Sequence, residues 1–245
     1  MLQIYSLKIA SILGLEADSE KAMRIDSLLD SERLAIVKRT SANLSGCATA
    51  RGAGLLLQYV GQLFLCGKIN VAPIDINDAS STDTNDASNM TALTIKSLDI
   101  ERVLDSIDNP IDFKYEHGAD GKPYWKDERL PFFNISHSDG TVVLVISDVE
   151  TGIDIQKIKS KNELSMAERF YSENEARLVE ESSADNYELF YKLWARKEAL
   201  GKCTGRGVRP YLDTDVSDMS SDYMKQYRWL EGKTDDCFVC VCSKI

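Results

Sequence analysis

The stretch FFNISHSDGTVVLVISDVETGIDIQ, residues 132–156, carries the clearest structural pattern of the chain. Phe132–Ser136 has the composition of a strand, and the run TVVLVIS over Thr141–Ser147 is typical of a buried, β-branched strand. The four residues HSDG at 137–140 form a tight connection between the two strands. We therefore predict a β-hairpin that carries His137 at its tip.

A further strand follows at Gly152–Gln156, and its two faces differ. Ile153 and Ile155 share one face, whereas Asp154 and Gln156 share the other, with their side chains about 6.6 Å apart along the strand. Hard divalent cations prefer such oxygen-bearing side chains, and Mg²⁺ typically takes one or two carboxylates together with phosphate oxygens and water. The alternative for Asp154 is an acid at a strand end that accepts backbone hydrogen bonds.

The segment KLWARKEALGK, Lys192–Lys202, places one acid between two lysines on a predicted helix. Glu198 and Lys202 are neighbours one turn apart, and Lys197 lies about 100° around the helix from Glu198. If Glu198 faces Asp154, the two acids form a small metal site bordered by ammonium groups, which suits a diphosphate. The alternative is a solvated helix face with a weak ion pair.

The first 115 residues combine one strand with long helices. Leu2–Lys8 alternates as a strand does, and residues 18–67 have the apolar spacing of helices. The segment from about residue 70 to 90 is rich in Asp, Ser, Thr and Asn, and no Lys or Arg occurs between Ile69 and Ile95. We expect this acidic polar insertion to be a solvated loop.

The C-terminal part repeats this order of elements. A capping box of Ser172 and Glu175 begins one predicted helix, residues 185–202 form another, and strands lie within residues 223–243. Strand, helices and strands thus occur twice, which predicts an α+β fold of two similar halves, residues 1–148 and 149–245, with a cleft between them.

Composition excludes several classes of protein. The 245 residues include 29 Lys and Arg against 39 Asp and Glu, a net charge of −10, which argues against a nucleic-acid partner. No apolar run approaches the roughly 18 residues that span a membrane, and the N-terminus lacks the pattern of a signal peptide. The run CFVCVC at 237–242 is typical of buried thiols rather than of disulfides or a metal site. We expect a cytoplasmic protein without a membrane partner.

Four short motifs occur along the chain: GKPYW at 121–125, FNISHSDG at 133–140, TGIDIQ at 151–156 and LWARKEALGK at 193–202. Together, over about Lys122–Gly207, they resemble the Sfp-type 4′-phosphopantetheinyl transferases. The resemblance implies a pseudo-two-fold α+β fold that binds coenzyme A between its halves. It also implies Mg²⁺-dependent transfer of the phosphopantetheine arm from coenzyme A to a serine of an apo acyl or peptidyl carrier protein, with adenosine 3′,5′-bisphosphate as the second product.

The resemblance also assigns roles to individual residues. The metal-binding positions are Asp154, Gln156 and Glu198. Glu198 and Lys197 are the catalytic candidates, and Lys197 and Lys202 are expected to hold phosphates. The remaining coenzyme-binding positions are Lys122, Pro123, Ser136 and His137. Many relatives have Glu where this chain has Gln156, and the neutral amide removes one negative charge from the metal site.

The N-terminal half is expected to supply a cation for the 3′-phosphate of the coenzyme. The candidates are Arg33, Lys38, Arg39 and Arg51, of which we prefer Arg51. We expect a monomer, because two halves of one chain can build the whole cleft. The competing class is a non-catalytic module that binds coenzyme A or a nucleotide and has a weakened metal site at Gln156.

Overall fold

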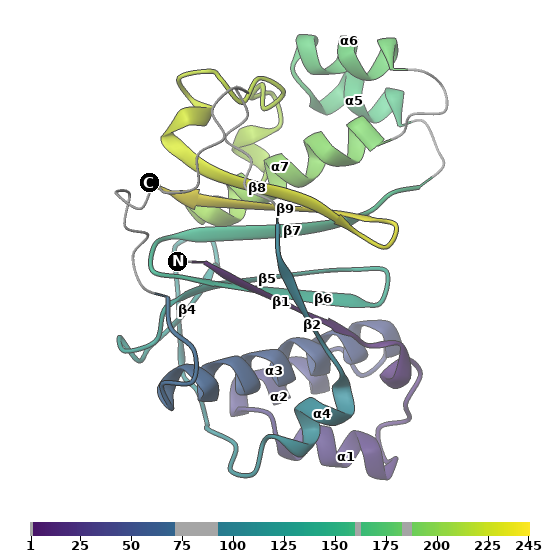
Figure 1. Cartoon of the computed structure of the whole chain (residues 1–245). Coiled ribbons are helices and arrows are strands. Elements are labelled where there is room, and N and C mark those ends of the chain that lie inside the picture. The colour runs from purple at the N-terminus through teal and green to yellow at the C-terminus, as the bar shows by residue number, and fades with distance from the viewer. Residues whose placement is uncertain (1, 72–92, 160–162, 183–187) are drawn as a thin grey trace.

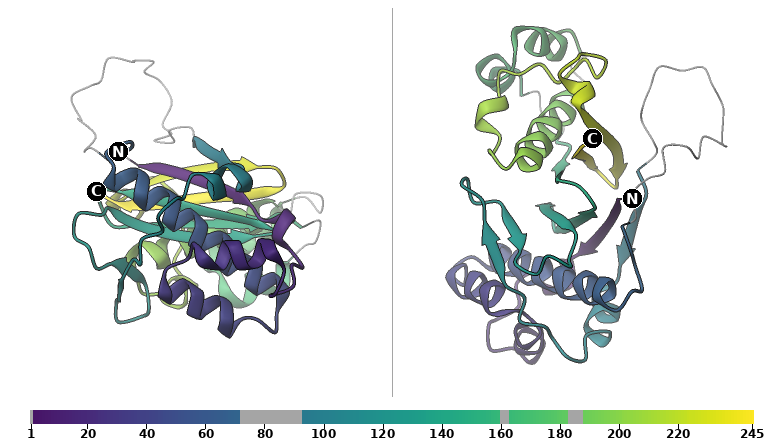
Figure 2. Two further views of the ribbon diagram at one scale, coloured as in Figure 1. Left: turned by 90° about the horizontal axis from the view of Figure 1, so that it is seen from below. Right: turned by 90° about the vertical axis from the view of Figure 1, so that its left-hand side faces the viewer.

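The computed structural model describes residues 2–71, 93–159, 163–182 and 188–245. These residues form four layers in the order helices, sheet, sheet, helices (Figure 1), and the right-hand view of Figure 2 shows the two helical layers at opposite ends. The predicted combination of helices with antiparallel strands is confirmed at this level. The polar insertion at residues 70–90 lies almost wholly outside the described residues.

The first sheet has the strand order β2-β1-β6-β5. Its strands are β1 (Gln3–Lys8), β2 (Ile95–Leu98), β5 (Phe132–Ser138) and β6 (Thr141–Ser147). Strands β1 and β2 are parallel, and the other pairs are antiparallel. One face is covered by α1 (Glu20–Ser27), α2 (Ser31–Arg39), α3 (Leu44–Leu65) and α4 (Ile100–Asp105). A small hairpin of β3 (Tyr115–His117) and β4 (Pro123–Trp125) lies beside this sheet.

The second sheet is antiparallel, with the order β7-β9-β8. It consists of β7 (Thr151–Lys157), β8 (Tyr227–Thr234) and β9 (Cys237–Lys244). Helices α5 (Leu164–Phe170), α6 (Glu173–Glu181) and α7 (Glu188–Thr204) cover its outer face (Figure 1). Short 3₁₀ turns complete the described chain at Ala10–Ile12, Arg209–Tyr211 and Met224–Gln226.

Alternation along the strands divides the core between the layers. Val143 and Val145 of β6 meet Ile153 and Ile155 of β7 between the sheets, in a cluster that also includes Val239. The intervening β6 residues point instead to the α3 side, and the β9 cysteines Cys240 and Cys242 point to the α7 side. The expectation that these thiols are buried is therefore confirmed.

Several local predictions are confirmed, and one is wrong. The Ser172 and Glu175 capping box forms as expected. The hairpin between β5 and β6 turns on Asp139 and Gly140, whose φ angles are 47° and 73°. Because an Asp-Gly pair tolerates positive φ at both positions, two residues suffice for the turn. His137 therefore lies within β5, opposite Val142, and not at the tip of the hairpin.

No helix of the described part of the chain has the length and apolar character needed to cross a membrane.

Candidate functional site

Polar side chains of β5 join the two sheets. Three of them accept hydrogen bonds from alternate backbone N–H groups of β7, which faces them with an unpaired edge. The bonds run from Ile153 to Asn134 at 3.0 Å, from Ile155 to Ser136 at 3.4 Å and from Lys157 to Ser138 at 3.0 Å. This alternation explains the N-x-S-x-S pattern within FNISHS, and it holds β5 against the strand that carries Asp154.

A close approach of β7 to α7 sets the other side of the site. A Cβ atom at Gly152 would lie 2.2 Å from the backbone oxygen of Ala199, so only glycine allows this spacing. Gly152, Asp154 and Gln156 share one face of the strand, and that face looks toward α7. The glycine therefore brings Asp154 up against the helix that carries Glu198.

Asp154 is the centre of a hydrogen-bonded group. Its side chain is only 4% exposed. Its Oδ1 atom accepts hydrogen bonds from Lys202 Nζ at 2.6 Å and from Ser136 Oγ at 2.7 Å, and Lys202 also bonds to Ser136 at 2.8 Å. Its Oδ2 atom accepts a hydrogen bond from Gln156 Nε2 at 2.7 Å. The structure thus brings four of the sequence-predicted residues into direct contact.

Glu198 belongs to the same site. Burial raises the pKa of the Glu198 carboxyl, the negative charge of Asp154 raises it further, and Lys202 acts in the opposite direction. The buried carboxylate of Asp154 and the half-buried carboxylate of Glu198 repel each other and together attract a cation, and Lys202 neutralises only part of their charge.

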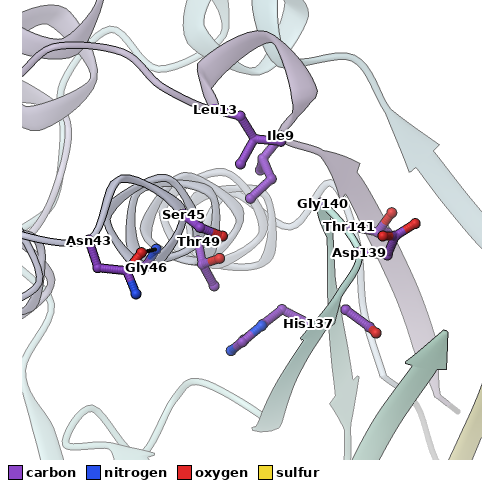
Figure 3. A pocket seen from close by; sticks show the side chains of 11 residues that line it. Ile9, Leu13, Asn43, Ser45, Gly46, Thr49, His137, Asp139, Gly140 and Thr141 are labelled. Carbon is purple, nitrogen blue, oxygen red and sulfur yellow. Dashed lines mark hydrogen bonds between the residues drawn. The ribbon is translucent and has the colours of Figure 1, made fainter.

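A cavity of about 460 Å³ opens on the His137 side of this group. It is lined by the N-terminal part of α3, by Ile9 and Leu13 on either side of the 3₁₀ turn that follows β1, and by the β5–β6 hairpin. Figure 3 shows the His137 ring pointing into the cavity, below Ser45 and Thr49 of α3. Burial lowers the pKa of His137, and the positive charge of Lys202 lowers it further. The cavity therefore lies within electrostatic reach of the Asp154 group.

A second cavity, of about 200 Å³, opens on the Gln156 side. Its walls include the aromatic side chains of Phe190, Tyr191 and Trp194 of α7, and Lys159 and Glu163 add one charge of each sign. One member of the Asp154 group, Gln156, thus lines this cavity, and His137, the neighbour of Ser136 in β5, lines the first.

Comparison with known proteins shows a similarity in the C-terminal part of the chain. Residues 150–242 match the family model of the 4′-phosphopantetheinyl transferase superfamily. Over these residues the chain is similar to this superfamily.

Curated proteins that match the chain are named 4′-phosphopantetheinyl transferases. The chain is similar to the 4′-phosphopantetheinyl transferase psf-1 of Bacillus pumilus, with 37% identity over 44% of the chain and 46% of the relative. It is similar to ffp of Bacillus subtilis, with 36% identity over 43% and 47%, and to Sfp of Bacillus subtilis strain 168, with 35% identity over 42% and 46%. The chain therefore spans about half the length of the curated relatives that it matches.

The structure corrects the expectation that Lys197 binds a phosphate. Its side chain is fully buried and pairs with Glu175 at 2.7 Å. The other two N–H donors bond to the carbonyl oxygens of Tyr211 and Thr214. Because an ammonium group has three donors, none remains for a ligand. In this chain, Lys197 holds α6 and the segment after α7 together.

Two other predicted phosphate or coenzyme contacts are also corrected. The buried Lys122 ammonium bonds to Glu150 at 2.6 Å and to the carbonyl oxygens of Thr151 and Cys203, which uses all three donors. The side chain of Arg51 is 2% exposed and makes a bidentate pair with Asp26 at 2.8 and 2.9 Å. Both are structural ion pairs.

The remaining candidates lie away from the Asp154 group or at its margin. Pro123 is in β4, opposite His117, and it lines neither cavity. Arg33 lies over the ring of Tyr115, at 5.0 Å from its centroid. Lys38 and Arg39 are exposed on the last turn of α2.

The donor set of the site fits Mg²⁺. Asp154 and Glu198 supply hard carboxylate oxygens, and rotation of the Gln156 amide exchanges its N–H donor for a carbonyl oxygen. Among the described residues, no group of three or more His, Cys, Asp and Glu gathers as a metal site. The site therefore offers two carboxylates and an amide, which suits a cation whose other ligands are phosphate oxygens and water.

Sequence reasoning missed the partners of the buried lysines. Glu150 and Glu175 are ordinary acids in the sequence, and only the fold brings each of them to its lysine. It also missed the bridging roles of Asn134 and Ser138. The alternation of polar residues at 134, 136 and 138 is the one local signal that could have shown them.

Proposed function

We propose that this protein transfers the 4′-phosphopantetheine arm of coenzyme A to a serine of an apo acyl or peptidyl carrier protein in the presence of Mg²⁺. The observation that carries the proposal is the pair of carboxylates, Asp154 and Glu198, beside Lys202, with one cavity at the neighbouring Gln156 and another at His137. The match of residues 150–242 to the superfamily model suggests the reaction class, and the named relatives are 4′-phosphopantetheinyl transferases.

The arrangement supports one orientation of the coenzyme. Lys202 uses two of its three N–H donors on Asp154 and Ser136 among the described residues, so the third is available to a diphosphate oxygen. We place the nucleoside in the His137 cavity and the pantetheine arm toward the Gln156 cavity, whose aromatic walls suit an uncharged chain. Mg²⁺ would be held by Asp154, Glu198 and the Gln156 carbonyl oxygen, and it would supply positive charge at the diphosphate.

The chain's own residues then have distinct tasks. The serine hydroxyl forms a new bond to the β-phosphorus, the bond between this phosphorus and the bridging oxygen breaks, and adenosine 3′,5′-bisphosphate leaves. Lys202 donates to the phosphate oxygens as charge develops on them, which is the largest contribution that a fixed cation can make. Glu198, whose pKa is raised mainly by burial and then by Asp154, takes the serine proton directly or through a water molecule.

The two layers of sheet and helices support the proposed organisation in two related halves. We assign residues 1–148 to the nucleoside side and residues 149–245 to the metal and diphosphate side, with the cleft along β5 and β7. Ser136 and Asp154 come from different halves and meet within one chain. We therefore propose a monomer as the active form.

The test is mass spectrometry of a panel of apo carrier proteins incubated with this protein, coenzyme A and Mg²⁺. We expect one phosphopantetheine increment on the carrier, and we expect it to disappear when EDTA removes the metal or when the acceptor serine is replaced by alanine. If coenzyme A binds but no carrier in the panel is modified, the competing assignment, a coenzyme A-binding module with a weakened metal site at Gln156, is favoured.

A further inference from the structure

The His137 cavity has no cationic wall in the part of the chain that the structure describes. Its polar groups are Asn43, Ser45 and Thr49 on the α3 side and residues of the β5–β6 hairpin on the other side. Its one carboxylate, Asp139, pairs with Lys157 at 2.8 Å, and Lys157 also contacts Asp236 at 3.1 Å. The described lining contains no Lys or Arg.

The four cations that the sequence suggested for the 3′-phosphate pair with other residues or lie elsewhere. Arg51 pairs with Asp26, and Arg33 lies over Tyr115. Lys38 and Arg39 end helix α2 outside the described lining. The sequence from Ile69 to Ile95 contains no Lys or Arg at all. A phosphate in this cavity would therefore meet the His137 imidazole and hydroxyl, amide and backbone N–H donors instead of a guanidinium or ammonium group.

From this charge distribution we infer that the protein accepts coenzyme A and 3′-dephospho-coenzyme A almost equally. The inference rests on the proposed function, because it places the ribose of the coenzyme in the His137 cavity. Hydrogen bonds to an ionised partner are roughly twice as strong as those between neutral groups, and the strongest phosphate contacts are bidentate contacts from arginine. Without a cationic side chain in the cavity wall, loss of the 3′-phosphate removes little binding energy. The diphosphate, which Lys202 contacts, is the same in both compounds.

The decisive measurement is kcat/KM for both compounds with one carrier protein and saturating Mg²⁺. We expect the two values to agree within about fivefold, well below the effect of a charge-assisted contact. A preference of more than about 100-fold for coenzyme A overturns the inference but leaves the proposed function intact. If neither compound is a donor for any carrier, the proposed function fails, and the inference fails with it.

A variant that adds a positive charge tests whether the ribose of the coenzyme lies in the His137 cavity. Ser45 is exposed at the start of α3 and lines the cavity, so Ser45→Arg adds a guanidinium without filling the core. We expect this variant to favour coenzyme A over its dephospho form by about tenfold, the effect of one added charge-assisted contact. An unchanged ratio would place the ribose elsewhere and overturn the inference.

The matched control is Cys66→Lys, which adds a positive charge at the other end of the same helix. Cys66 is exposed, and it lies about 30 Å from Ser45 along α3. We expect the ratio of the two kcat/KM values to stay at its wild-type level. Finally, if the wild type strongly prefers coenzyme A and Lys38→Ala or Arg39→Ala abolishes the preference, the cation lies on α2 and the inference is overturned.

Discussion

Two of the lysines of helix α7, Lys197 and Lys202, lie in opposite environments. Lys197 has a side chain that is 0% exposed, with all three donors bonded to Glu175 and to backbone oxygens. Lys202 is 26% exposed, bonds to Asp154 and Ser136, and keeps its third N–H donor unbonded among the described residues. Five residues along a helix correspond to a rotation of about 140°, so one motif serves two sides of the helix. A charged residue in a motif thus has a structural or a ligand-binding role according to what the fold places opposite it.

The neighbouring Arg196 strengthens the contrast. Its guanidinium forms a buried pair with Glu231 and also donates to the carbonyl oxygen of Val216 at 2.7 Å. Arg196 and Lys197 therefore anchor α7 to β8, α6 and the segment after α7. Glu198 and Lys202 lie on the side of α7 that faces β7 and β5. The anchors keep this second side in place.

The largest loss of activity is expected for Glu198→Gln, on the side of α7 that faces β7 and β5. The amide cannot carry the negative charge that holds Mg²⁺ or take the serine proton, so we expect transfer to fall about 10²- to 10³-fold. Burial and the charge of Asp154 raise the pKa of Glu198, which means that the folded state disfavours its negative charge. Replacing the carboxylate by a neutral amide should therefore not lower thermal stability. The matched control is Glu173→Gln, an exposed acid at the start of α6. Wild-type activity in Glu198→Gln would remove this residue from both proposed roles.

Substitutions on the other side of α7, where Arg196 and Lys197 form buried ion pairs, should lower stability. In Lys197→Met, the buried Glu175 carboxylate loses its partner, and we expect the free energy of unfolding to fall by about 3–5 kcal/mol. Urea denaturation followed by circular dichroism measures this change. The double variant with Glu175→Gln should regain part of the loss, because no unpaired charge remains. A single variant as stable as the wild type would show that the pair is not an anchor.

Lys202→Met is the counterpart on the side of α7 that faces β7 and β5. Asp154 keeps its hydrogen bonds from Ser136 and Gln156, so we expect a smaller loss of stability than in Lys197→Met. Transfer should fall about 10- to 100-fold, because a fixed positive charge at the diphosphate is lost. The assigned roles of the two lysines would be wrong if Lys202→Met lost more stability than Lys197→Met, and if Lys197→Met lost more transfer activity per folded molecule than Lys202→Met.

A smaller effect is expected for Gln156→Glu, which adds a third acid beside Asp154. Metal affinity rises with the number of charged oxygen ligands, so half-maximal activity should require several-fold less Mg²⁺. Gln156→Met, which lacks an oxygen, should shift the titration in the opposite direction. Identical Mg²⁺ titrations for all three proteins would mean that this side chain is not a ligand.

The smallest effect is on the titration of His137. Burial lowers the pKa of His137, and the charge of Lys202 lowers it further. The unfolded chain therefore binds this proton more readily, and folded stability decreases as pH falls through 6.5 toward the folded pKa. In Lys202→Met the His137 pKa should rise and this loss should shrink, whereas Lys197→Met should leave the pKa unchanged. NMR can follow it easily, since the chain has two histidines. Equal shifts in both variants would contradict the contrast between the two lysines.

Local elements were predictable because their signals lie within a few residues. The capping box at Ser172 and the two strands around Asp139 follow from short-range rules of hydrogen bonding and turn geometry. The small error at His137 came from the length of the turn. The short strand β2 was missed because its partner β1 lies about 90 residues away.

The sequence by itself determined which side chains share a face: Asp154 with Gln156 on a strand, and Glu198 with Lys202 on a helix. These relations depend only on the periods of the two structures. Tertiary structure decided which charged groups remain available to bind a ligand. Lys197 and Arg51 are unavailable because they form ion pairs with Glu175 and Asp26, which lie 22 and 25 residues away in the sequence. Burial makes such pairing obligatory, because an unpaired charge is too costly inside the protein, and no local pattern identifies the partner.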